Sequence, residues 1–306
     1  KDEEQVDKIL KQIDKKQYKV VDIIKNERRK NPPAPFTTSS LQQEASRKLG
    51  FGVKKTMMIA QKLYESGHIT YMRTDSIRLS DDAKKMAKDY ITKNFGNSYY
   101  LAREFKAKDN AQDAHEAIRP THVENQLELT RDEEKLYNLI LNRFLASQMS
   151  VAVYDTTKIK INVEDYIFNI NGSVIKFDGF MKLYIEGKDD KAKGKHDNDD
   201  DDDELNALPE FEVGEILKQK ELKADKKTTE PPARYTEASL VKVMEEKGVG
   251  RPSTYAPTIS TIEDRLYIEK QGKYLIPTDL GTVVNKIMEE NFENIVDVQF
   301  TADMEN

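Results

Sequence analysis

The sequence predicts a multidomain fold of α-helices and β-strands, with a mainly helical region, a β-rich region and a second helical region of winged-helix type. Three observations predict it. The chain has 306 residues, more than one hydrophobic core usually organises. Apolar residues recur at helical spacing between residues 39 and 149 and again after Pro232. From Val151, between these regions, short alternating runs are typical of strands.

The N-terminal segment predicts one helix and one strand. Val6, Leu10 and Ile13 are spaced as on one helix face. Tyr18–Ile24 is rich in β-branched side chains and predicts a strand. The prolines of residues 31–36 then interrupt regular structure.

Capped helices follow. Ser39 can cap a helix with Gln42 as its partner, and Gly50 supplies a left-handed stop. Residues 53–67 keep helical spacing, whereas residues 68–72 alternate as in a strand. Further helical segments are predicted over residues 80–94 and 131–149.

The β-rich region predicts a meander. Its strands are the runs KIKINV, YIFNI, SVIKF and MKLYI, with ILKQKEL as a later addition. Residues 188–204, which are mostly charged, predict a solvated loop. After Pro232 the pattern is helix, turn, helix and a hairpin over residues 266–276, which is typical of a winged-helix module.

The composition excludes several classes of protein. No apolar run approaches the roughly 18 residues of a membrane span. The absence of cysteine excludes disulfides, thiolate metal sites and cysteine nucleophiles. The N-terminus lacks the apolar stretch of a secretory signal. We therefore expect a soluble, cytoplasmic chain with no membrane partner.

The net charge of -6 is concentrated in one place. Residues 188–204 contain nine acidic and four basic side chains, a net of -5, which leaves -1 for the rest. Residues 31–80 contain seven Lys or Arg and three acids, a net of +4. Such a basic stretch can face a phosphate backbone, so the acidic total does not exclude a nucleic acid partner.

The segment richest in reactive groups is ITYMRTDS, residues 69–76. Side chains two positions apart share a strand face, so Arg73 would lie beside Tyr71. A guanidinium can stabilise both a phenolate and the charge on phosphoryl oxygens. The structural alternative makes Tyr71 a half-buried strand aromatic and pairs Arg73 with Asp75.

Three strings carry a resemblance to a known family. They are APFTTSSLQQEASRKLGFGVKKTMMIAQKLYESGHITYMRTDS, AQDAHEAIRPT and PPARYTEASLVKVMEEKGVGRPSTYAPTISTIEDRLYI. In this order they resemble the active-site and DNA-binding regions of bacterial DNA topoisomerase I, a type IA DNA topoisomerase. Residues 50–65 look like the bacterial form rather than topoisomerase III or reverse gyrase.

The resemblance implies that Tyr71 attacks one DNA strand and becomes joined to the 5′ phosphate. Religation after strand passage would relax negative supercoils without ATP. Arg73 and His115 are the implied catalytic partners, and His115 would bind a neighbouring phosphate or help a proton to move. A lone histidine is otherwise more often structural.

DNA contacts near the tyrosine are implied for a further set of residues. Gln61 and Glu65 share a helix face, although an ordinary polar face is an equal alternative. Asp75 would orient the neighbouring guanidinium. Thr70 and Thr74 would donate hydrogen bonds to phosphate.

A second group of DNA contacts is implied near residue 250. Ser253 would cap a helix whose free N–H groups favour phosphate. Arg251 adds a cation, Thr254 a hydroxyl, and Tyr255 a stacking surface. Arg265 would end that helix. The alternative is a helix-turn-helix packed only for its own stability.

The family's metal-binding Toprim domain is not recognisable in the chain. The resemblance implies Mg²⁺ for the intact enzyme, with ligands outside this sequence, so no metal residue is assigned. The chain also starts without methionine. We expect a monomeric fragment that binds single-stranded or negatively supercoiled DNA but is deficient in relaxation.

The resemblance also implies domain boundaries. Residues 31–155 would form the helical domain carrying Tyr71, and residues 1–30 with 156–225 a β-rich arch or hinge of a toroid. Residues 226–306 would form the helical DNA-binding base domain. A bacterial, nucleoid-associated location is implied.

Two other functions stay open. A winged-helix DNA-binding protein without covalent chemistry predicts that Tyr71→Phe changes nothing. A structural fragment that docks a basic protein through residues 188–204 makes the acidic run essential instead.

Overall fold

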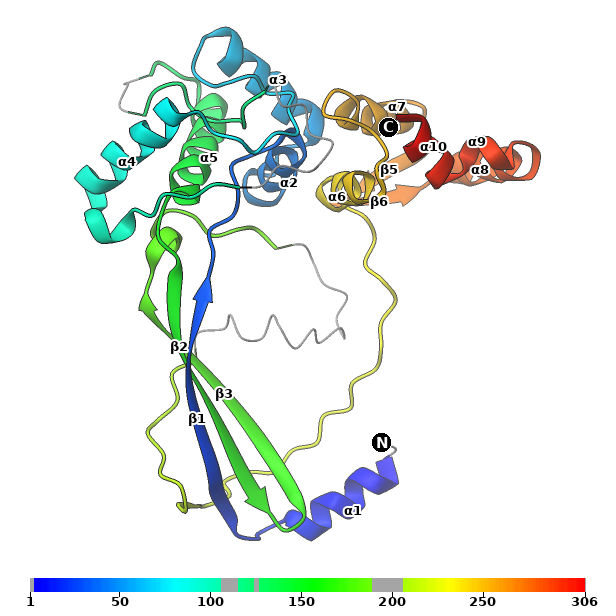
Figure 1. Ribbon diagram of the computed structural model, residues 1–306. Helices are drawn as coiled ribbons and strands as arrows, with labels where there is room; N and C mark the ends of the chain where they lie inside the picture. The colour runs from blue at the N-terminus through cyan, green and yellow to red at the C-terminus, as the bar shows by residue number, and fades with distance from the viewer. Residues whose placement is uncertain (1–2, 106–114, 124–126, 189–205, 306) are drawn as a thin grey trace. The chain divides into compact units, whose positions relative to one another are not determined.

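A computed structural model describes residues 3–105, 115–123, 127–188 and 206–305 (Figure 1). The predicted loop over the acidic run lies almost wholly outside the described residues. Contacts divide the chain into two compact units. The strand unit contains Lys1–Asn31, Val151–Gly179 and Lys191–Pro232, and the helical unit contains Pro32–Ser150, Phe180–Asp190 and Ala233–Asn306. The three-domain division stays a prediction.

The strand unit is a helix and an antiparallel sheet of order β3-β2-β1-β4. Val20, Ile159 and Ile161 form its buried core. The elements are α1 (Glu3–Ile13), β1 (Tyr18–Lys30), β2 (Ala152–Val163), β3 (Tyr166–Phe177) and β4 (Ile216–Leu217).

The strands are longer and fewer than predicted. β1 continues six residues past Ile24 through a charged run, because it pairs with β2 as far as Lys30. YIFNI and SVIKF form one strand, β3, in which Gly172 pairs with Thr157. A Cβ at Gly172 would lie 2.5 Å from the Leu208 side chain, so this position needs a glycine for close packing rather than for a turn. The run MKLYI is not a strand, and ILKQKEL pairs only through β4.

The helical unit contains two groups of helices. The first comprises α2 (Thr38–Leu49), α3 (Val53–Glu65), α4 (Asp81–Phe95), the short 3-10 helices η1 (Asn97–Tyr99) and η2 (Gly179–Lys182), and α5 (Arg131–Ser147). The second comprises α6 (Glu237–Lys247), α7 (Tyr255–Asp264), the β5 (Ile268–Gln271) and β6 (Tyr274–Pro277) hairpin, α8 (Asp279–Asn291), α9 (Glu293–Val296) and α10 (Val298–Glu305). The predicted helix-turn-helix with its hairpin is confirmed.

Most helix ends follow from local chemistry. Ser80 caps α4, and Gly50 ends α2 at φ 66°, both as predicted. The predicted cap of α2 at Ser39 is wrong. Thr37 is the cap, and it exchanges hydrogen bonds with Ser40. Ser39 lies inside the helix, where it is buried.

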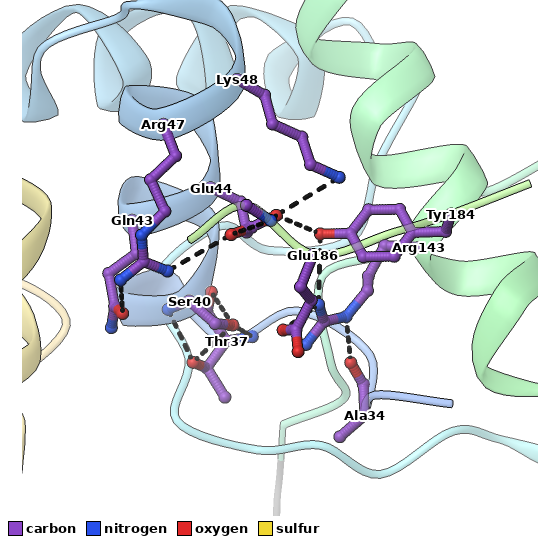
Figure 2. Close-up of polar contacts among 11 residues, drawn as sticks. Ala34, Thr37, Ser40, Gln43, Glu44, Arg47, Lys48, Arg143, Tyr184 and Glu186 are labelled. Carbon is purple, nitrogen blue, oxygen red and sulfur yellow. Dashed lines mark hydrogen bonds and ion pairs between the residues drawn. The ribbon is translucent and has the colours of Figure 1, made fainter. Parts of the chain in front are cut away.

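α2 is a polar helix that is nonetheless buried, because Glu44 has many partners (Figure 2). Its Oε2 accepts a hydrogen bond from the Tyr184 hydroxyl at 2.6 Å and from the Gly187 amide at 3.0 Å. Arg47 and Lys48 form ion pairs with the same carboxylate at 3.3 Å and 3.4 Å. Glu44 therefore ties the segment after the 3-10 helix η2 to α2.

Arg143 of α5 extends this cluster (Figure 2). Its guanidinium donates to the Ala34 carbonyl oxygen, to the Tyr184 hydroxyl and to Glu186 at 2.7 Å. Burial opposes ionisation of Glu44, but its hydrogen bonds and the nearby cations hold the carboxyl pKa below its usual range. Burial raises the pKa of Tyr184, which therefore stays a hydroxyl donor.

Glu44→Gln should lower the free energy of unfolding by about 2–3 kcal/mol at pH 7, because it leaves buried donors and cations without a charged partner. The folded pKa is depressed, so the stabilisation is complete above the unfolded value near ~4.3 and is lost as pH falls through the folded value. Urea unfolding of both proteins between neutral and acid pH measures this. Glu134→Gln, at an exposed site on α5, is the control and should change stability by less than about 0.5 kcal/mol. If Glu44→Gln lowered the free energy of unfolding as much at acid pH as at pH 7, the stabilising role of the Glu44 charge would be contradicted.

Candidate active site

Residues 69–76 form a loop, and the predicted strand over 68–72 is wrong. Only one bridge, between Ile69 and Pro120, joins the loop to a neighbour in strand fashion. The alternation that predicted a strand is nevertheless present in burial. Met72 and Thr74 are buried, whereas Tyr71 and Arg73 are exposed. Tyr71 and Arg73 therefore both face out of the protein, as the spacing predicted.

Thr38 fixes the loop from the first turn of α2. Its hydroxyl donates to the Met72 carbonyl oxygen at 2.8 Å and accepts from the Thr74 amide at 2.9 Å. The Thr38 amide donates in turn to the Thr74 carbonyl oxygen at 2.9 Å. These bonds hold the backbone on both sides of Arg73.

Thr70 fixes the loop on its other side. Its hydroxyl donates to the Ala117 carbonyl oxygen at 2.7 Å and accepts from the Arg119 amide at 2.9 Å. This bonding places the segment after His115 alongside the tyrosine. The hydroxyl is thus already used by the protein, so a phosphate contact from Thr70 stays a prediction without geometric support.

Three aromatic rings lie close together at Tyr71, the predicted nucleophile. The Tyr71 ring lies 5.6 Å from the His115 ring and 5.2 Å from the Tyr64 ring, measured between centroids. The Tyr64 contact is edge-to-face, a favourable geometry for aromatic pairs. Tyr71 is 36% exposed, so part of its side chain reaches solvent although two other rings lie close to it.

Arg73 is exposed and Asp75 is half-buried. No ion pair joins the two side chains in the described part of the chain, so the orienting role of Asp75 stays a prediction. Glu116 and Arg119, which follow His115, pair with each other at 2.6 Å. Burial opposes ionisation of Glu116, but Arg119 lowers its pKa overall.

Gln61 and Glu65 share a face of α3, as predicted, and are both exposed. The Gln61 amide donates to the Glu65 carboxylate at 2.8 Å. Thr74 is 1% exposed, and its hydroxyl accepts from the Ser76 amide. Thr74 therefore shapes the loop, and this geometry does not support the predicted phosphate contact.

The turn before α7 differs from the prediction in two ways. Ser253 does not cap α7, since Thr254 occupies the cap position without a side-chain cap bond. The Thr254 hydroxyl instead accepts from the Arg251 amide at 2.8 Å. Tyr255 is buried rather than a stacking surface, because Gly250 leaves room for its ring. Arg265 ends α7 as predicted and is exposed.

α6 and α7 pack on α3 through a shared apolar cluster. Its buried members are Val53, Val241, Met244, Tyr255, Ala256 and Ile259. Glu237 of α6 reinforces the contact by accepting the Val53 amide at 2.5 Å, which supplies the missing side-chain cap of α3. The Ser39 hydroxyl donates to Glu245 at 2.6 Å.

Among the described residues, no three His, Asp or Glu side chains converge on a position that could hold a metal ion. None of the helices described is both long and apolar enough to cross a membrane.

The described chain combines a mixed fold, a helix-turn-helix with its hairpin and an exposed tyrosine beside a histidine. Comparison with known proteins gives the family. A family model described as DNA topoisomerase matches residues 1–306. Full-length topoisomerase I from Thermotoga maritima has 41% sequence identity and a TM-score of 0.82, over 100% of this chain and 50% of that chain. The chain belongs to the DNA topoisomerase family, in its bacterial type IA topoisomerase I form, and spans half the length of the Thermotoga protein.

Two residues at the site were not found from the sequence. Tyr64 lies near the end of α3, before the Tyr71 loop begins. Its place in the string QKLYESGHITY, which is part of the family resemblance, was the available sequence signal. Thr38 gave no signal, because its partners lie 34 and 36 positions away.

Thr38→Val should leave α2 folded but free the loop, because valine keeps the shape and removes both side-chain bonds. Amide exchange of residues 72–76 should become about ten- to hundredfold faster, in line with the loss of one or two buried hydrogen bonds. Hydrogen-exchange mass spectrometry measures it. Thr92→Val, which removes an exposed helical bond on α4, should leave this loop unchanged. Unchanged protection at 72–76 would show that Thr38 does not hold the loop.

Proposed function

We propose that this chain supplies the nucleophile and part of the DNA path of a type IA topoisomerase. Tyr71 attacks a phosphodiester of one strand, and the enzyme then passes a strand and religates. The observation that carries the proposal is the exposed Tyr71 ring close to the rings of His115 and Tyr64, with Arg73 exposed two residues on.

The chemistry needs both a proton acceptor and a cation. A protonated phenol is a weak nucleophile, so its proton must leave as the bond from oxygen to phosphorus forms. His115, when neutral, can accept that proton or bind a neighbouring phosphate. Arg73 stabilises the negative charge that grows on the phosphoryl oxygens. The bond from phosphorus to the 3′ oxygen breaks, and that oxygen takes a proton to become a hydroxyl.

The covalent phosphotyrosine keeps the energy of the broken bond, so religation needs no ATP. We further propose that Mg²⁺ and a separate acidic group act from parts of the parent protein outside this chain. The chain would act as a monomer on single-stranded or negatively supercoiled DNA, at the cytoplasmic nucleoid. Gln61, Glu65 and Arg265, which are all exposed, are candidate contacts with the strand.

The proposal is tested by mixing this chain with the separately produced remainder of its parent, Mg²⁺ and a labelled single-stranded oligonucleotide. A covalent adduct should form. Tyr71→Phe should abolish it without weakening oligonucleotide binding more than about threefold, and Arg73→Ala should slow it about 10²–10³-fold. Tyr166→Phe, in the strand unit, is the matched control and should react normally.

The opposite outcome identifies the rival function. A covalent adduct that still forms with the Tyr71→Phe variant would show that Tyr71 is not the nucleophile. Binding without any adduct, unaffected by Tyr71→Phe, favours a non-catalytic winged-helix DNA-binding protein.

The chain alone, incubated with negatively supercoiled plasmid and Mg²⁺, should not relax it efficiently, because the described residues provide no metal site. Gel electrophoresis of the topoisomers measures this. Efficient relaxation by the purified chain would contradict the need for a separate metal-binding part.

A further inference from the structure

An internal carboxylate already occupies the turn at Gly250 and Arg251, which the family resemblance implies as a DNA contact. The Gly250 amide donates to Glu305 Oε2 at 2.5 Å. Arg251 Nη1 lies 3.8 Å from the same oxygen, and Arg251 Nη2 donates to the Glu305 carbonyl oxygen. One residue of α10 therefore takes donors from both Gly250 and Arg251.

Packing places α10 against this turn. Ala302, one helical turn before Glu305, is buried at 4% exposure. A Cβ built at Gly248 would lie 3.4 Å from the Ala302 Cβ, so the two residues are in contact. Gly248 and Gly250 both have positive φ, 73° and 85°, which favours glycine at each position. The turn and α10 thus fit closely, and Glu305 reaches the donors from a fixed helix.

The surrounding charge is unfavourable for another anion while Glu305 is in place. Tyr255 packs against Gly250, and four charged neighbours shift its pKa. Burial, followed by the carboxylates Glu245, Asp75 and Glu305, raises the pKa of Tyr255 to about 12, and Arg251 acts in the opposite direction. Three carboxylates thus act against one guanidinium here. One of these carboxylates, Asp75, belongs to the Tyr71 loop.

We propose that Glu305 competes with a DNA phosphate for the Gly250 amide and the Arg251 guanidinium. Without DNA, the carboxylate fills the position, and a phosphate of single-stranded DNA displaces it. The inference rests on the proposed function, since it takes the turn as a phosphate contact. Carboxylate and phosphate oxygens accept the same donors, and a guanidinium binds either.

The ion pair between Arg251 and Glu305 is weak enough for a phosphate to replace the carboxylate. The Arg251 and Glu305 side chains are 38% and 32% exposed, and ion pairs this exposed contribute little net stability. A phosphate in the same place would be held by the same donors, with one carboxylate fewer nearby. When a DNA phosphate displaces Glu305, the end of α10 is released from the turn. Binding of the DNA strand and release of α10 are therefore coupled.

The test measures binding of a labelled single-stranded oligonucleotide to this 306-residue chain by fluorescence anisotropy at low salt. Glu305→Gln should lower Kd about three- to tenfold, because the competing charge is gone. Glu305→Ala, which also removes the acceptor, should bind at least as tightly. Asp303→Asn removes an equal charge from the same helix, where Asp303 accepts a hydrogen bond from Gln299, and should change Kd less than about twofold. Thermal unfolding of each variant checks that the fold is kept.

A double-mutant cycle separates competition from a general charge effect. In an Arg251→Ala background, Glu305→Gln should tighten binding less, because only the competition for the Gly250 amide is left. An undiminished gain there, or equal gains in Glu305→Gln and Asp303→Asn, overturns the inference. If the unaltered chain does not bind the oligonucleotide, the proposed function fails first. If it binds, and Arg251→Ala weakens binding while Glu305→Gln does nothing, only the competition is refuted.

Discussion

The geometry of the candidate site depends on one hydroxyl group, that of Thr38. The Tyr71 loop lacks a strand ladder, and its alternating exposure persists because Thr38 bonds the backbone at Met72 and Thr74. Those two side chains point inward, so Tyr71 and Arg73 must point outward. A side chain fixed in this way loses little further freedom when a substrate arrives, which is how positioning lowers a barrier.

α2 transmits this constraint to the rest of the helical unit. Along one helix, Thr38 holds the loop, Ser39 bonds Glu245 of α6, and Glu44 bonds Tyr184. Buried polar groups are costly unless paired, so each of these three partners stabilises the helix. The same helix therefore joins the candidate active site, the helix-turn-helix and the segment that follows the strand unit.

The sequence predicted those features that depend on neighbouring residues. Gly50 and Ser80 marked helix ends correctly, since capping is local. The run MKLYI failed because alternation forms a strand only when a partner strand is available, and none pairs with it in the described chain. Tyr255 was misjudged because its burial depends on the space left by Gly250. Contacts with distant residues of this kind cannot be seen in the spacing of residues along the sequence. The predicted role of Tyr71 came from the family resemblance instead.

Two exposed phenol groups lie with their rings 5.2 Å apart at the site, and only the one on the loop fixed by Thr38 is assigned the reaction. The decisive measurement is peptide mass spectrometry of the parent enzyme after it has been trapped on a single-stranded oligonucleotide. A nucleotide mass joined through its 5′ phosphate to Tyr71 is the predicted result. The same mass on Tyr64, or on a peptide outside residues 69–76, would contradict the account.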